Sequence, residues 1–223
     1  MQTLSERLKI IASFVPKGTA VTDVGTDHGY LPAALCLSGD YKSVTATDVR
    51  EKPLQNAKKN LEKLSVKGVD LVLCNGLMDV PEKKAETVII AGMGGDVISG
   101  IIDRCPYKTK PLFILQPMTA AGVLREYLAK NGFCVLRETA VCENSKIYSV
   151  MVCKFDGENY ELTPCRKRIG ILKPTNENNT AYIKKQSDIL KKCISQMENA
   201  GKFGDISDEL KSAKTEIDKI LEG

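Results

Sequence analysis

A short run of residues near the amino terminus carries the groups best suited to binding a nucleotide. Residues 20–30 read A-V-T-D-V-G-T-D-H-G-Y, an apolar strand-like run that ends in a turn containing Gly25 and Gly29. Gly25 permits a backbone turn that a β-carbon would block, and Gly29 lets the following helix begin close to a ligand. A second strand-like run ends in Asp48, at the distance expected of a ligand-binding acid. The spacing predicts a βαβ nucleotide-binding unit.

The polar residues inside this turn favour one class of nucleotide over another. A dinucleotide site needs bare backbone amides where the pyrophosphate lies, whereas this turn places Thr26, Asp27 and His28 between the two glycines. The Asp27 carboxylate repels phosphate but can pair with an ammonium group. S-adenosylmethionine (SAM) carries an ammonium, a sulfonium and no phosphate, and Asp48 is placed to accept hydrogen bonds from its ribose hydroxyls. The alternative is a structural glycine turn with two solvated acids.

Three later segments add candidate groups at the ends of predicted strands. Asn75, Gly76 and Leu77 follow the run 69–73, and the amide of Asn75 offers a donor and an acceptor to an adenine edge. Ala91 ends the fourth predicted strand and Gly92 to Gly95 follow it, where closely spaced glycines indicate backbone lying against a ligand. Gln116 and Pro117 follow the fifth. Because carboxyl ends of parallel strands meet at one edge of a sheet, we expect these segments to border one cleft.

The amino-terminal helix contributes one further candidate. Apolar residues recur at helical spacing over residues 3–15, which predicts an amphipathic helix ahead of the first strand. In a SAM-binding domain such a helix packs over the methionine end of the cofactor. Arg7 is therefore a candidate partner for the SAM carboxylate, and a solvated surface arginine is an equally weighted alternative.

The elements that must position these groups alternate between strand and helix. Strands are predicted over 20–24, 44–48, 69–73, 87–91 and 111–115, helices over 31–37, 51–64, 97–102 and 120–130, and a closing antiparallel hairpin over 133–142 and 147–155. This order predicts an α/β fold with a seven-stranded, mostly parallel, Rossmann-like sheet. We expect it to form a SAM-binding methyltransferase domain over residues 1–155.

Residues 156–223 have a different pattern. Residues 163–168 read as a Pro-containing basic connector and 173–176 as a second break. Apolar residues then recur at helical spacing from Tyr182, with an interruption at 201–204, which predicts an antiparallel helical hairpin resembling a coiled coil. Its acidic and basic residues balance, so the net charge of +4 lies in the first domain. A packing role and RNA contact are both open for this unit.

Composition excludes several classes of protein. The 223 residues are 43% hydrophobic, and they contain neither an apolar run long enough for a membrane helix nor a secretion signal. We expect a cytoplasmic protein with no membrane association. The eight cysteines are scattered without a C-x-x-C pair and are read as reduced core thiols. Since His28 is the single histidine and has no neighbouring ligands, no metal site is predicted.

Taken together, the motifs are similar to those of a known family. The segments L-S-E-R-L at 4–8, D-V-G-T-D-H-G-Y-L-P at 23–32, N-G-L at 75–77, A-G-M-G-G at 91–95 and L-Q-P-M at 115–118 resemble the bacterial tRNA (adenine-N1)-methyltransferases that modify adenine 22. The resemblance covers essentially the whole chain. One departure is Asn75, where aspartate is common in the family.

The resemblance implies SAM as methyl donor and structured tRNA as substrate, and it implies no particular protein partner. It implies cofactor contacts from Arg7 and from the turns containing Gly25, Asp48, Asn75 and Gly92. Adenine N1 has a free lone pair at neutral pH, so the enzyme's task is alignment and no strong base is needed. Asp27, Gly94, Gln116 and Pro117 are the groups expected around the reacting base. A SAM enzyme with another substrate and a non-catalytic SAM- or RNA-binding module are the alternatives.

Overall fold

A computed structural model describes residues 4–201 and 204–222 of the chain. Its elements, in order, are α1 (Glu6–Ser13), β1 (Ala20–Val24), α2 (Tyr30–Ser38), β2 (Ser43–Asp48), α3 (Glu51–Lys63), β3 (Val69–Leu73), the 3-10 helix η1 (Glu82–Lys84), β4 (Thr87–Gly94), α4 (Gly95–Asp103), β5 (Leu112–Thr119), α5 (Ala121–Lys130), β6 (Phe133–Glu143), β7 (Lys146–Phe155), α6 (Pro164–Ile169), α7 (Glu177–Asn199) and α8 (Asp205–Glu222).

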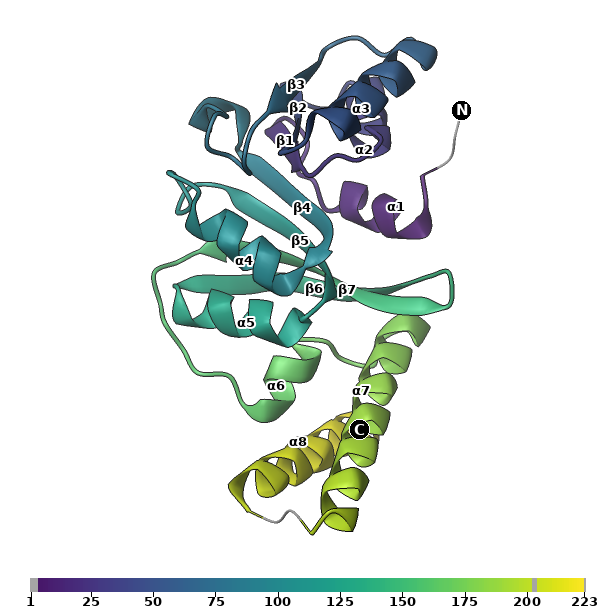
Figure 1. Ribbon diagram of the computed structural model, residues 1–223, viewed down its shortest axis with the longest axis vertical. Helices are drawn as coiled ribbons and strands as arrows, with labels where there is room; N and C mark the ends of the chain where they lie inside the picture. The colour runs from purple at the N-terminus through teal and green to yellow at the C-terminus, as the bar shows by residue number, and fades with distance from the viewer. Residues whose placement is uncertain (1–3, 202–203, 223) are drawn as a thin grey trace.

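Seven strands form one sheet in the order β3-β2-β1-β4-β5-β7-β6 (Figure 1). The first five are parallel, and β7 pairs antiparallel with both β5 and β6. The predicted mostly parallel sheet with a closing antiparallel hairpin is therefore confirmed. The carboxyl ends of β1, β2, β4 and β5 lie along one edge, as a parallel arrangement requires.

Helices cover both faces because the central strands are apolar on both sides. In β4, Val88 and Ile90 face the core beneath α4 and α5, whereas Ile89 packs with Ile11 of α1 and Leu35 of α2 on the opposite face. All five of these side chains are buried. The alternation explains why β4 reads as a continuous apolar run, the pattern of a strand covered on two faces.

Strands β4 and β5 extend further than the sequence indicated. They were expected to end at residues 91 and 115, but the pairing continues through Met93 opposite Pro117 and Gly94 opposite Thr119, with register shifts on either side of Met93. Gly92 has φ of 81° at this irregularity. A bulge at a glycine keeps strands paired while redirecting the chain, which is why the glycine-rich segment is part of the sheet rather than a free loop.

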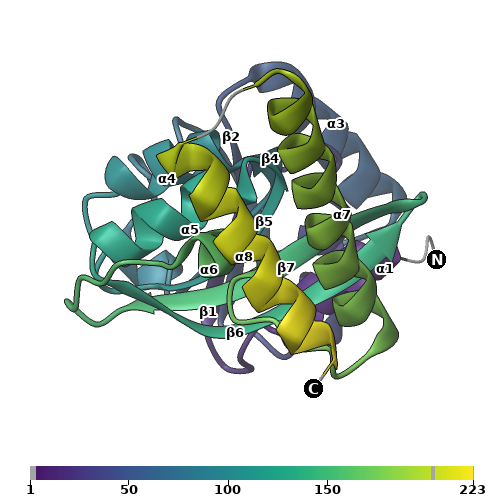
Figure 2. The ribbon, with the colours of Figure 1, turned by 90° about the horizontal axis from the view of Figure 1, so that it is seen from below.

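The carboxyl-terminal part forms the expected helical hairpin, with α7 and α8 in contact (Figure 2). Two boundaries differ from expectation. Residues 163–168 were read as a connector, but Pro164 begins α6. Proline is tolerated at the first helical position because the N–H it lacks would have no partner within the helix. The Thr163 side chain caps the helix by accepting a hydrogen bond from Arg166 N. Helix α7 begins at Glu177, capped by Asn176, five positions earlier than the apolar pattern suggested.

The helical hairpin shares a small core with the sheet. Ala140 of β6 and Ile147 of β7 pack with Ile169 of α6, Ile183 of α7 and Ile217 of α8. In Figure 1 these helices lie at the end of the sheet carrying β6 and β7, opposite the end carrying β3. No helix in the described part of the chain is long and apolar enough to cross a membrane.

Candidate active site

The turn after β1 is built as a cradle. Gly25 has φ of 80°, and a β-carbon there would collide with the side chain of Met93. The backbone N–H groups of Gly25 and Thr26 both donate to the carbonyl of Thr47, at 2.8 and 2.9 Å, which ties the turn to the end of β2. Gly29, with φ of 70°, begins α2 where a β-carbon would press on Ala57. The positive φ favours glycine at both positions, and at Gly29 the close approach of Ala57 adds a steric reason, whereas the Met93 side chain near Gly25 can move.

Asp27 and His28 are exposed on this turn. The Asp27 side chain is 70% exposed, and its carboxylate lies 3.2 Å from His28 Nε2. The His28 ring stacks on Tyr30 with ring centroids 5.6 Å apart. Asp27 was grouped with Gln116 around the reacting base, but no hydrogen bond in the described part of the chain joins the two side chains. A role for Asp27 at a ligand ammonium stays a prediction.

Asp23 is a candidate that the sequence interpretation passed over. It lies on β1 between the core residues Thr22 and Val24, and only 7% of it is exposed. Burial raises the pKa of its carboxyl to about 6, partly offset by a hydrogen bond with the Thr26 side chain. A buried carboxyl group with a raised pKa, two residues before a glycine turn at a strand end, is a candidate functional position. The signal in the sequence was an acid inside an apolar run, two residues before the first glycine.

The ends of β2 and β3 form the next part of the edge. Asp48 is 7% exposed, and its Oδ1 accepts from the backbone N–H of Arg50 at 2.8 Å, which fixes the carboxylate. Thr47 Oγ1 donates to the carbonyl of Gly76 at 3.1 Å, joining this strand end to the turn after β3. Asn75 is exposed, as an adenine contact would need, whereas the Leu77 side chain is 1% exposed in the core and can offer a ligand only its backbone.

A connected polar cluster lies where β4 and β5 end. Arg7 Nη1 donates to Gln116 Oε1 at 2.8 Å, and the same oxygen accepts from Gly92 N at 3.2 Å. Arg7 Nε donates to Glu143 Oε2 at 3.0 Å. Arg7 is half-buried and bonded to Gln116 and Glu143, so the reading of it as a solvated surface residue is wrong. Its contact with a SAM carboxylate stays a prediction. Glu143 was missed because the polar turn after β6 gave no indication that it folds back to the cleft.

The opposite charges of Glu143 and Arg7 stabilise each other in this cluster. Burial disfavours ionisation of Glu143, but hydrogen bonds from Ser5 and Arg7 and the charge of Arg7 outweigh it, so the pKa of this carboxyl is lowered. Arg7 is thus held by an ionised carboxylate. Its Nη2 and the second hydrogen on Nη1 are not needed for the bonds to Glu143 and Gln116, so the guanidinium keeps donors for an incoming anion.

The backbone conformation of Gly94 and the burial of Pro117 could not be predicted from the sequence. Gly94 has φ of −67° and caps α4, so its backbone is open to any residue; a β-carbon there would lie 2.5 Å from Asp96 Oδ1. The left-handed conformation belongs to Gly92, whose backbone is exposed. Pro117 is buried beside Gln116, and Ala91 is half-buried. Among the described residues no group of His, Cys, Asp and Glu side chains could hold a metal.

Comparison with known proteins agrees with this geometry. A family model described as a methyltransferase domain matches residues 4–151. The fold and the site therefore define a class I, Rossmann-like methyltransferase.

Relatives match the chain over nearly its whole length. A tRNA (adenine(22)-N(1))-methyltransferase of Bacillus subtilis is 27% identical over 97% of this chain and 94% of its own. A crystal structure of a Streptococcus pneumoniae protein, described as a candidate tRNA (m1A22) methyltransferase, is 30% identical, with a TM-score of 0.83 over 98% of this chain and all of that one. The same protein in complex with S-adenosyl-L-methionine is 29% identical with a TM-score of 0.82. This chain belongs to the tRNA (m1A22) methyltransferase family.

Proposed function

We propose that this protein transfers the methyl group of SAM to N1 of adenine 22 in tRNA. The observation that carries the proposal is the Arg7–Gln116–Gly92 cluster, which lies on the same sheet edge as the Gly25 turn and Asp48. The full-length similarity to tRNA (m1A22) methyltransferases supplies the substrate. Because the proposed substrate is tRNA, the cytoplasm is the expected compartment.

The residues present fit SAM. The turn at Gly25 has a left-handed backbone that favours glycine, Asp48 presents a fixed carboxylate where ribose hydroxyls need an acceptor, and Asn75 is exposed for an adenine edge. Arg7 would hold the carboxylate of the methionine moiety through its remaining donors, and Asp23 lies where a buried acid can face its ammonium. When bound, SAM supplies an electrophilic methyl group on a sulfonium.

The chain's own contribution is alignment. Adenine N1 carries a lone pair that is free at neutral pH, so no side chain has to remove a proton before attack. Gln116 is fully buried and is held by Arg7, by Gly92 N and by its own bond to the Pro117 carbonyl at 2.9 Å. Because this amide has no exposed surface, it acts by fixing Arg7 and the exposed backbone of Gly92, against which a base can lie edge-on. Well-oriented reactants account for a large part of enzymatic rate enhancement.

Mass spectrometry tests the proposal directly. An unmodified tRNA transcript incubated with the enzyme and labelled SAM is digested to nucleosides, and we expect 1-methyladenosine with the label. The matched control is the same transcript with guanine in place of adenine 22, which should gain no methyl group. Label at another nucleoside, or methylation of both transcripts, would contradict the assigned target. A small-molecule substrate would instead give binding without the steep salt dependence of phosphate contacts.

A further inference from the structure

A groove of about 520 Å³ lies between the sheet and the carboxyl-terminal helices. One wall is the segment from Pro117 to Gly122, which begins one residue beyond Gln116 of the cleft. The other wall comes from α6 and α7 and carries Lys167, Arg168 and Lys185. The groove therefore starts at the lip of the proposed methyl-transfer cleft and runs along the helical hairpin.

The lining combines cations with an aromatic and apolar floor. Lys167 Nζ lies 3.4 Å from Glu126, whereas no acidic group of the described residues lies within ion-pair distance of Arg168 or Lys185. Tyr148 and the exposed side chain of Met118 line the groove between its walls. Even with Glu126 and Glu209 present, two cations are available to an anion. Cations beside an aromatic surface suit a nucleic-acid strand, whose phosphates and bases need both.

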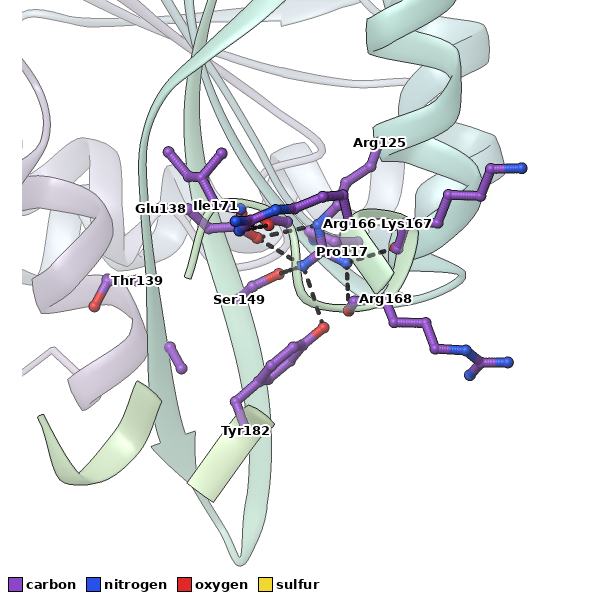
Figure 3. Close-up of polar contacts among 12 residues, drawn as sticks. Pro117, Arg125, Glu138, Thr139, Ser149, Arg166, Lys167, Arg168, Ile171 and Tyr182 are labelled. Atoms are coloured by element: carbon purple, nitrogen blue, oxygen red, sulfur yellow. Dashed lines mark hydrogen bonds and ion pairs between the residues drawn. The ribbon is translucent and has the colours of Figure 1, made fainter. Parts of the chain in front are cut away.

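A buried ion pair fixes the wall that carries these cations (Figure 3). Arg125 of α5 is 3% exposed, and its Nη2 lies 2.6 Å from Oε1 of Glu138, whose side chain is fully buried. Nη1 of Arg125 donates to the carbonyls of Lys167 and Arg168 at 3.1 and 2.8 Å. These are among the last carbonyls of α6, which have no partners within the helix. One guanidinium thus joins the sheet to the end of α6.

Further contacts tie the Arg125–Glu138 pair to the end of α6 and to α7. Glu138 Oε2 accepts from Ile171 N at 3.0 Å, and Tyr182 OH of α7 lies 3.3 Å from Arg125 Nη2. A β-carbon on Gly170 would collide with Glu138, which explains a glycine with φ of 60° at this position. In Figure 3 the side chains of Lys167 and Arg168 extend outward on one side while their carbonyls face Arg125. Arg125 therefore sets the position of the groove's basic wall.

We propose that this groove binds a phosphodiester segment of the RNA substrate next to the target base, and that Arg125 is the positioning residue that holds Lys167 and Arg168 in place. The inference rests on the proposed function, since it assigns the path of that same substrate. Arg168 and Lys185 contact phosphates, and Tyr148 offers a stacking surface. Arg125 does not touch RNA; it acts through the α6 carbonyls.

The phosphate contacts are tested by neutralising Arg168 and Lys185. We expect Arg168→Gln/Lys185→Gln to raise the KM for tRNA about tenfold or more and to reduce the salt dependence of tRNA binding by roughly 1.5–2 in slope. SAM affinity, measured by calorimetry, should not change. The matched control is Lys63→Gln/Lys83→Gln, which removes the same charge from exposed lysines before β3 and β4, at the opposite edge of the sheet. Equal salt slopes for the two double variants would overturn the assignment of the groove.

The positioning role is tested by removing both buried charges together. Arg125→Met/Glu138→Met leaves no unpaired buried ion, and such replacements are often neutral for stability. We expect a cooperatively melting protein with unchanged SAM affinity and a tRNA KM raised at least about fivefold, because the α6 carbonyls lose their donor. Arg125→Lys keeps the charge but loses the planar fork, and should show part of the same KM increase. A folded double variant with the parental KM would overturn the positioning role.

The failure of this inference differs from failure of the proposed function. If the parent enzyme formed no 1-methyladenosine in the tRNA transcript, the proposed function itself would fall. If the parent methylated tRNA and both groove variants kept its KM and salt slope, only the groove assignment would fall.

Discussion

Arg7 of α1 and Gln116 of β5 are joined by a 2.8 Å hydrogen bond across 109 positions of the chain. Because Gln116 Oε1 also accepts from Gly92 N, one buried amide holds the amino-terminal helix and two strand ends in a fixed relation. Helix α1 is therefore tied to the ends of β4 and β5 and is not only a cover for the sheet.

Gln116→Ala should be more harmful than the loss of one orienting hydrogen bond. It leaves the N–H of the exposed Gly92 and one donor of the half-buried Arg7 without their acceptor, and each lost hydrogen bond costs about 0.5–1.5 kcal/mol. We expect kcat/KM for tRNA to fall about 10- to 100-fold, measured by single-turnover methylation after a melting check. Gln196→Ala, at an exposed position on α7, is the control. Equal rates for the two variants would place the reacting groups elsewhere.

The two glycines at the end of β4 should respond differently to alanine. Gly92 has φ of 81°, where alanine costs roughly 1–2 kcal/mol, whereas Gly94 has φ of −67° and meets only the movable Asp96 side chain and Thr119 Oγ1. We expect Gly92→Ala to lower both the melting temperature and the methylation rate more than Gly94→Ala. Circular dichroism melting and initial rates at saturating SAM compare them. The reverse order would show that space at Gly94, and not conformation at Gly92, limits this segment.

Asp48→Ala tests the cofactor site. Removal of the carboxylate leaves two ribose hydroxyls without a charged acceptor, so SAM binding should weaken by about 1.5–3 kcal/mol. Because Asp48 also accepts from Arg50 N, Asp48→Asn, which keeps an acceptor, separates loss of charge from loss of the turn. Calorimetry measures both, with Asp40→Ala as a control near the opposite end of β2. An unchanged affinity in Asp48→Ala would sink the assignment of this edge to SAM.

Asp23 should make stability depend on pH. Its pKa in the folded protein, about 6, lies above its unfolded value near 3.8, so the folded state binds more protons between these values and stability falls as pH rises through them. Asp23→Asn removes this penalty. We expect the unliganded variant to be more stable by up to about 3 kcal/mol at pH 7, with the gain disappearing below about pH 4.

Urea unfolding at pH 7 and at pH 4 measures the Asp23 effect. If Asp23 faces the SAM ammonium, Asp23→Asn should bind SAM more weakly at pH 7. The variant would then be more stable without ligand and have a lower affinity for SAM. A stability difference that is equal at both pH values would show that Asp23 carries no raised pKa.

Truncation after Phe155 tests the proposed division into two domains. All seven strands lie before that residue, so we expect a folded core that binds SAM. Its melting temperature should fall, because Ala140 and Ile147 lose their apolar cover and the Arg125–Glu138 pair loses its contacts with α6 and α7. Methylation of tRNA should be almost lost. Full activity of the truncated protein on tRNA would show that the helical hairpin and the groove are dispensable.

The sequence predicted the features that follow from the spacing of apolar residues along the chain. Strand and helix positions followed from periodicity, and the order of elements placed Gly25, Asp48 and Gln116 on one edge. It did not predict the partners of polar side chains, because periodicity gives the face of an element and not the residue opposite. Neither the Arg7–Gln116 bond nor the Arg125–Glu138 pair could be read from spacing. Pro164 was misread because proline both breaks helices and begins them.

The turn between β6 and β7 determines where the Glu143 side chain lies. Asn144 and Ser145 have φ of 50° and 60°, as in a type I′ turn, and Glu143 pairs with Lys146 across it. Side chains alternate between the two faces of a strand, so a shift of one residue in pairing moves each of them to the opposite face. One inserted residue in β6 would therefore turn Glu143 away from Arg7 while leaving composition and hydrophobicity almost unaltered. The length of this hairpin is as much a part of the active site as the identity of the residues it carries.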